Sequence, residues 1–133
     1  MMPFANAAAL RQQLHNLAEL SDQEIETARF IAELLRETGY EPQTGVGGHG
    51  VGASLKGAEP GPVVMLRTDI DALPFPDETD PEKTVAIHAC GHDAHAVMLL
   101  ALAARLQDRR DELKGEVRFV FQPAEESLEG PTA

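Results

Sequence analysis

His88-Ala89-Cys90-Gly91-His92-Asp93-Ala94-His95 joins a polar loop to the most apolar run of the chain. It holds the only cysteine and three of the five histidines. Thiolate and imidazole are preferred ligands of zinc and related divalent ions, and carboxylates join them readily. In an extended segment, His88, Cys90 and His92 can face one side. The alternative is a strand-to-helix turn whose polar residues cap a buried helix, but the density of donors favours a metal site.

Two apolar strands are predicted on either side of this segment, and acidic residues follow both. Val63–Leu66 is a continuous apolar run, the form of a buried central strand, and it leads to Asp69 and Asp71. Glu116–Phe121 alternates between polar and apolar residues and leads to Glu125-Glu126. Open α/β sheets usually place their chemistry at the carboxyl ends of strands. The acidic residues also have structural alternatives, as loop caps or as an acidic helix N-terminus.

A buried helix over about 94–107 is predicted between these strands, because the run from Ala96 is apolar nearly all round. A connection of this length allows strands near 63–68 and 117–121 to pair in parallel, with the helix covering their sheet. The other expected elements are helices over 5–20 and 22–38, a glycine-rich hairpin over 41–57, a turn over 59–62 and an exposed loop over 75–83. Ser21 and Glu24 form a capping-box pattern for the second helix, and His15 is expected at the surface.

Composition narrows the class of protein. The 133 residues suffice for one globular domain. The net charge of -11 argues against nucleic acid and anionic membrane surfaces as partners. A single cysteine fits a reducing compartment. The longest apolar run, residues 96–104, is far shorter than the ~20 residues that span a bilayer, so we expect a cytoplasmic protein.

Three motifs together resemble a known family. They are LRTDIDALP (66–74), HACGHDAH (88–95) and FQPAEE (121–126). Their order and spacing resemble the metal-dependent amidohydrolases of the aminoacylase and carboxypeptidase superfamily. The most similar branch contains hippurate hydrolase, N-acyl-amino-acid amidohydrolases and auxin-conjugate hydrolases. The resemblance begins near Leu14-His15, where that branch also carries an LH element.

The resemblance implies an α/β, three-layer, zinc-peptidase-like catalytic domain with a central mixed sheet flanked by helices. It also implies a pair of divalent ions, zinc or manganese. By this resemblance Cys90 bridges the ions, His92 and Glu126 are further ligands, and Glu125 is the general base. Asp69 matches an aspartate that orients a ligand in sister branches.

Members of the family are longer than this chain, with a lid domain and further histidine ligands downstream. We therefore expect residues 1–133 to be the N-terminal part of the catalytic domain, without the lid. The implied function of the longer enzyme is hydrolysis of amide bonds in N-acyl amino acids or small peptides. The alternatives are a non-catalytic remnant that binds metal weakly, and thiol chemistry with Cys90 as nucleophile. We also expect self-association, through an unpaired sheet edge near Phe119 and Phe121.

Overall fold

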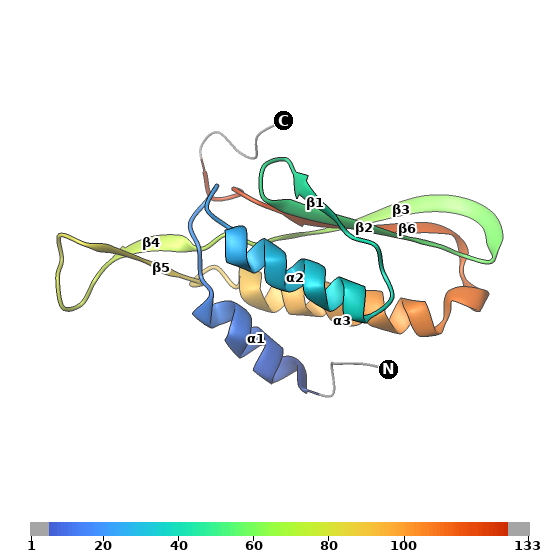
Figure 1. Ribbon diagram of the computed structural model, residues 1–133, viewed down its shortest axis with the longest axis horizontal. Helices are drawn as coiled ribbons and strands as arrows, with labels where there is room; N and C mark the ends of the chain where they lie inside the picture. Colours follow the sequence, from blue (N-terminus) through green and yellow to red (C-terminus); the bar gives the residue numbers. More distant parts are fainter. Residues whose placement is uncertain (1–5, 128–133) are drawn as a thin grey trace.

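Two strands that pair in parallel, and that are connected in the sequence through a helix, form the framework of the fold (Figure 1). The structure is a computed structural model and describes residues 6–127. Its helices are α1 (Ala7–Asn16), α2 (Ile25–Glu37) and α3 (His92–Asp108), with a short 3-10 turn, η2 (Arg110–Glu112). Its strands are β1 (Gln43–Val46), β2 (Gly50–Lys56), β3 (Glu59–Asp69), β4 (Leu73–Pro76), β5 (Thr84–Ile87) and β6 (Lys114–Gln122).

The main sheet is mixed and has the strand order β1-β2-β6-β3. β6 pairs with β2 antiparallel and with β3 parallel, and α3 supplies the crossover between β3 and β6. The predicted parallel pair and the mixed sheet are both confirmed. Within residues 6–127 no helix has the length and hydrophobicity needed to cross a bilayer.

The core lies between one face of the sheet and the helices. On β6, Val117, Phe119 and Phe121 are buried and alternate with the exposed Arg118, as expected for a strand covered on one face. In Figure 1, α2 and α3 lie along this face and α1 lies outside α3. Tyr40, which follows α2, meets Phe119 edge to face with ring centroids 5.6 Å apart. The α/β class is thus confirmed.

Two expectations about β3 and β6 are wrong. β3 lies at the edge of the described sheet, with Val63 and Met65 55% and 61% exposed, although its apolar run predicted a central strand. The central strand is β6, which pairs on both sides, so Phe119 and Phe121 are fully buried and do not form an edge. Continuous apolar runs fit strands covered on both faces. Burial of this run would therefore require a partner beyond the described residues.

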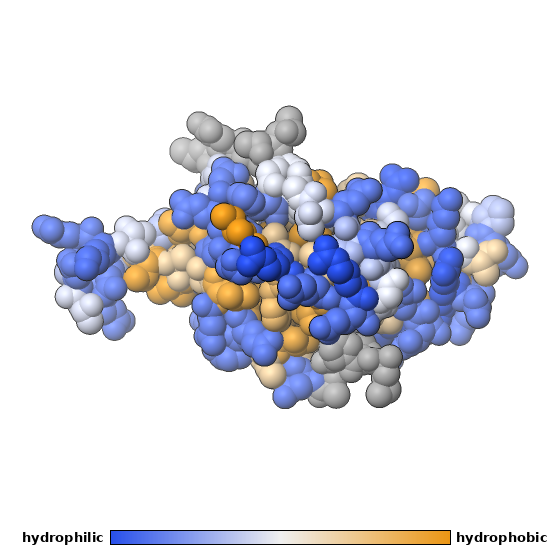
Figure 2. All heavy atoms as spheres, in the orientation of Figure 1, coloured by the Kyte–Doolittle hydropathy of each residue, from blue (hydrophilic) through white to orange (hydrophobic). Residues whose placement is uncertain are grey.

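The segment after β3 also differs from the prediction. The exposed loop expected over 75–83 is the tip of a hairpin in which Leu73 pairs with Ile87 and Pro76 with Thr84. This hairpin, β4–β5, projects from the body in Figure 1. Figure 2 shows a hydrophilic tip, with hydrophobic residues gathered nearer the body. These strands were not predicted from the sequence, because proline interrupts a strand pattern and is tolerated mainly in edge strands.

The predicted capping box is wrong as well. Glu24 occupies the N-cap position of α2 but makes no capping bond with its side chain. Glu19 caps the helix instead, because its Oε1 accepts a 2.6 Å hydrogen bond from the Thr27 amide. The Ser21 hydroxyl donates to Asp71 at 2.8 Å. The segment between α1 and α2 therefore directs polar side chains toward the carboxyl end of β3.

Candidate metal centre

Three segments meet where β3 and β6 end. Asp69 lies opposite Gln122 in the parallel register, so both strands leave the sheet at the same edge. Helix α3 begins beside them at His92, after Gly91 with a left-handed φ of 90°. The prediction that Asp69 and Glu126 lie at the same end of the sheet is confirmed, since both approach His92.

The imidazole of His92 is the centre of a cluster of carboxylates and a thiol. Its Nε2 atom lies 3.8 Å from an oxygen of Asp69, 3.7 Å from one of Glu125 and 3.7 Å from one of Glu126. Donor atoms of Cys90, His92 and Glu126 all lie within 4.8 Å of one another, as do those of Asp69, His92 and Glu125. Donors about 2.0–2.3 Å from a tetrahedral ion lie roughly 3.3–3.8 Å apart, so the spacing fits a bound divalent cation.

The other nitrogen of the His92 ring fixes its orientation. Nδ1 lies 3.0 Å from the main-chain oxygen of Asp71 and 3.2 Å from its Oδ1. Both are acceptors, so Nδ1 is the donor, and in the neutral ring the lone pair of Nε2 faces the cluster. A ligand histidine usually donates its second N–H to a carboxylate or carbonyl in this way.

Asp71 was not singled out by the resemblance, which gave the orienting role to Asp69. In the structure Asp69 faces Nε2 of His92 and forms an ion pair with Arg67. Asp71 is fully buried, and its Oδ2 accepts 2.8 Å bonds from the Ser21 hydroxyl and from the Glu126 amide. Asp71 therefore connects the backbone of one candidate ligand with the ring of another.

The two adjacent glutamates occupy a turn, and not a strand or a helix, in the described residues. In a strand their side chains would point to opposite sides. In the turn, both carboxylates reach within 3.7 Å of the His92 Nε2 atom. The side chain of Glu126 is 27% exposed and that of Glu125 is 38% exposed. Glu125 and Glu126 therefore both place a carboxylate oxygen beside the Nε2 atom of His92.

The environment of Cys90 disfavours a thiol nucleophile. Burial raises the pKa of its thiol, and the neighbouring Glu126 carboxylate raises it further. A reactive cysteine needs a lowered pKa and electropositive surroundings. Here the surroundings are acidic, so ionisation of the thiol calls for a cation at the cluster. The donor set fits that requirement, because it combines a thiol, an imidazole and carboxylates.

A second polar cluster lies beside the first, between α1 and α3. Asp93 is buried, and its Oδ2 accepts bonds of 2.9 Å from Nε of Arg11 and from Nδ1 of His15. His15, which was expected at the surface, is 33% exposed and also bonds to Asp93 across the contact between α1 and α3. His88 is buried nearby, where burial lowers the pKa of its imidazole. The structure brings neither His88 nor His95 into the metal cluster.

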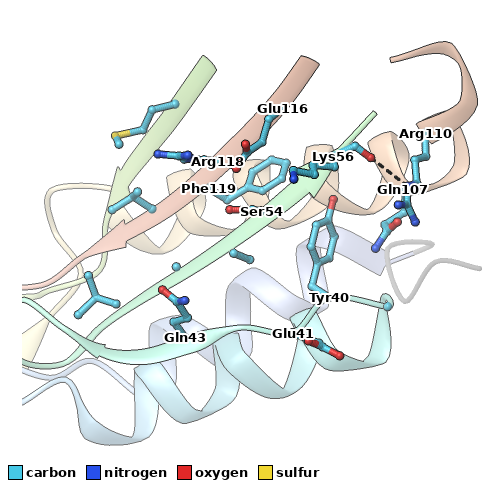
Figure 3. Close-up of a pocket in the computed structure, with 16 residues that line it drawn as sticks. Tyr40, Glu41, Gln43, Ser54, Lys56, Gln107, Arg110, Glu116, Arg118 and Phe119 are labelled. Atoms are coloured by element: carbon cyan, nitrogen blue, oxygen red, sulfur yellow. Dashed lines mark hydrogen bonds and ion pairs between the residues drawn. The ribbon is translucent and has the colours of Figure 1, made fainter. Parts of the chain in front are cut away.

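A hollow of about 560 Å³ lies elsewhere, between the ends of α2 and α3 and the sheet (Figure 3). Tyr40, Lys56, Arg110 and Glu116 are among its lining residues. None of the four residues predicted for the metal site lines it. The candidate site therefore rests on its donor cluster and not on this hollow.

Comparisons with known proteins identify relatives of this chain. The family model for peptidase family M20/M25/M40 matches residues 65–133. N-acetylcysteine deacetylase of Bacillus subtilis is 45% identical over 129 residues, covering 91% of this chain and 33% of the relative. Thermostable carboxypeptidase 1 of Saccharolobus solfataricus is 43% identical over 122 residues, covering 88% of this chain and 31% of the relative.

A solved structure extends the similarity to three dimensions. The YXEP protein of Bacillus subtilis, a dinuclear metal binding peptidase from the M20 family, superposes with a TM-score of 0.84 at 42% identity. The match covers 95% of this chain and 36% of that one. The chain thus spans about a third of the length of the curated relatives it matches.

Proposed function

The chain belongs to peptidase family M20/M25/M40, and on that premise we propose that residues 1–133 form the N-terminal part of a metal-dependent hydrolase domain. The reaction of the whole protein would be hydrolysis of an amide bond in an N-acyl amino acid or small peptide. The observation that carries the proposal is the convergence of a thiol, an imidazole and carboxylates on Nε2 of His92.

In this proposal Cys90, His92 and Glu126 hold a divalent ion, zinc or manganese. When bound, such an ion lowers the pKa of a water molecule to about 7 and polarises the amide carbonyl. Glu126 is favoured over Glu125 as the ligand, because Asp71 holds its amide and its side chain is less exposed. Glu125 is the general base: its carboxylate takes a proton from the attacking water and returns it to the leaving nitrogen.

The two candidate ligand groups share His92, whose Nδ1 is already bonded to Asp71. The described residues therefore offer one imidazole nitrogen to both groups. We infer that a site with two ions draws further donors from the rest of a longer protein. For the 133 residues alone we accordingly expect metal binding with little turnover.

The substrate class rests on the relatives. One is an N-acetylcysteine deacetylase and another is a carboxypeptidase, so both an acyl amino acid and a peptide remain as substrates. The single cysteine fits the reducing cytoplasm, where it serves as a ligand and not in a disulfide. We expect self-association through β3, which lies at the edge of the described sheet.

The test is a cobalt titration of the chain, because a cobalt–thiolate bond gives a strong near-ultraviolet absorption band. We expect saturable binding with this band, and loss of both in His92→Asn. His49→Asn is the matched control, since His49 lies in neither candidate ligand group. Equal binding by the two variants would contradict the site. The reaction is tested in a longer protein that contains this chain: its hydrolysis of N-acetyl amino acids should be abolished by a chelator and restored by metal, whereas the 133 residues alone should show little turnover.

A further inference from the structure

We infer that Glu24 is a positioning residue for the turn that carries Glu125 and Glu126. Its buried carboxylate holds Ala124 in a left-handed conformation, and this directs both glutamates toward His92. The inference rests on the proposed function, because it concerns the positioning of the proposed base and ligand. It adds a residue that lies 100 positions away from Ala124 in the sequence and belongs to neither candidate ligand group.

The backbone of Ala124 is in a conformation that alanine seldom adopts. Its φ is +54°, and Asp22 is the other non-glycine residue with positive φ among residues 6–127. In this region the side-chain β carbon crowds the backbone, so only glycine enters it freely. Ala124 is also fully buried, so water does not compete for its amide. Some contact must therefore hold the turn in this shape.

Glu24 provides that contact. Its Oε1 accepts a 2.7 Å hydrogen bond from the Ala124 amide, and the residue is fully buried. The other oxygen, Oε2, has no hydrogen-bond partner among the described residues. Burial of a carboxyl group costs free energy, and the hydrogen bond from the Ala124 amide offsets part of that cost. Glu24 does not cap its own helix, because Glu19 fills that role.

A second carboxylate holds the same turn two residues further on. Asp71 accepts the Glu126 amide at 2.8 Å, so the backbone is fixed on both sides of Glu125. Burial raises the pKa of Glu24, and proximity to Asp71 adds to the rise. The neutral form keeps an acceptor oxygen, as glutamine would. Acceptance of the Ala124 amide is therefore the property that a substitution has to preserve or remove.

The experiment compares Glu24→Met, Glu24→Gln and Glu24→Asp in the 133-residue chain. Methionine keeps the volume without an acceptor, glutamine keeps an acceptor at full length, and aspartate is one methylene too short to reach. Cobalt affinity should fall about 10–100-fold in Glu24→Met and Glu24→Asp, the range for residues behind a metal ligand, and less than about threefold in Glu24→Gln. Glu19→Met is the control, because within residues 6–127 the Glu19 carboxylate, which lies in the same segment, accepts hydrogen bonds only from amides of α2.

Hydrogen exchange of the Ala124 amide is the second measurement. It should be protected in the parent chain and in Glu24→Gln, and faster in Glu24→Met, whether or not cobalt binds. Failure of the parent chain to bind cobalt would overturn the proposed metal site. Unchanged exchange in Glu24→Met, or equal loss of affinity in Glu19→Met, would overturn the role of Glu24. If Glu24→Met does not fold, Glu24→Asp decides: affinity equal to the parent chain contradicts the inference.

Discussion

Replacement of Asp71 by asparagine tests whether one buried carboxylate joins the two halves of the site. Its Oδ2 accepts two bonds of 2.8 Å and its Oδ1 accepts a weaker one of 3.2 Å from His92. Asparagine has one acceptor oxygen, so it can serve only one side. The amide oxygen should stay with Ser21 and Glu126, where two short bonds are at stake, and the NH₂ group should face the N–H of His92.

These contacts set the expected loss of stability and of metal affinity in Asp71→Asn. A lost hydrogen bond to a buried charged group costs about 1.5–3 kcal/mol, which sets the expected fall in unfolding free energy. The main-chain oxygen of Asp71 remains 3.0 Å from Nδ1, so the ring keeps its tautomer and the effect on metal binding is limited. We expect about a tenfold loss of cobalt affinity, equivalent to ~1.4 kcal/mol and at the low end for residues behind a metal ligand.

Urea unfolding and cobalt titration at neutral pH measure the two losses. Asp80→Asn is the control, because the Asp80 side chain is 42% exposed and pairs with Lys83, and such surface pairs contribute little. Full parental affinity and stability in Asp71→Asn would refute the reasoning. A fall in stability with unchanged affinity would refute the coupling between Asp71 and the site.

Three further predictions follow from the same structure. Glu126→Ala should abolish cobalt binding whereas Glu125→Ala should retain most of it, and a titration that gives equal losses would reverse the proposed roles. Phe119→Ala should lower the unfolding free energy by about 3–5 kcal/mol, measured in urea against the exposed control Met65→Ala. Burial raises the pKa of Tyr40, the only tyrosine, above its ordinary 10.0. Burial of the neutral phenol therefore contributes to the unfolding free energy below pH 10, and this contribution is lost as pH rises above 10. Absorbance titration should show a raised pKa for Tyr40, and Tyr40→Phe should remove this alkaline loss of stability.

Much of the arrangement was predictable because strand periodicity and motif order are local signals. The parallel pairing of the strands near 63–68 and 117–121 followed from their pattern and from the length of the helical connection. The membership of the amidohydrolase-type family followed from the three motifs and is confirmed by the family model. The position of β3 at the sheet edge was not predictable, because an apolar run has the same pattern whether or not its neighbour lies within the chain.

The residues that hold the site could not be found from local pattern. Glu24 fits a capping box, and Asp71 is one of two acids in the same motif. Each is distinguished by a partner that is distant in the sequence: Glu24 bonds to Ala124, and Asp71 bonds to His92. A buried acid has no signature of its own in a single sequence, since burial depends on tertiary packing. The three-dimensional contacts were therefore needed to assign these two positions.

The first helix and the connection to the second have a consequence for the metal site. Ladder hydrogen bonds fix β3 and β6, but the candidate ligands lie beyond the strand ends. Side chains from residues 11–24 restrain those segments: Arg11 and His15 bind Asp93, Ser21 binds Asp71, and Glu24 binds Ala124. Helix α1 buries only two leucines, so these polar contacts form a large part of its docking. Because coupling between two binding events is reciprocal, an ion bound at the proposed site would stabilise the docking of α1 by the same factor by which docking raised the affinity for the ion.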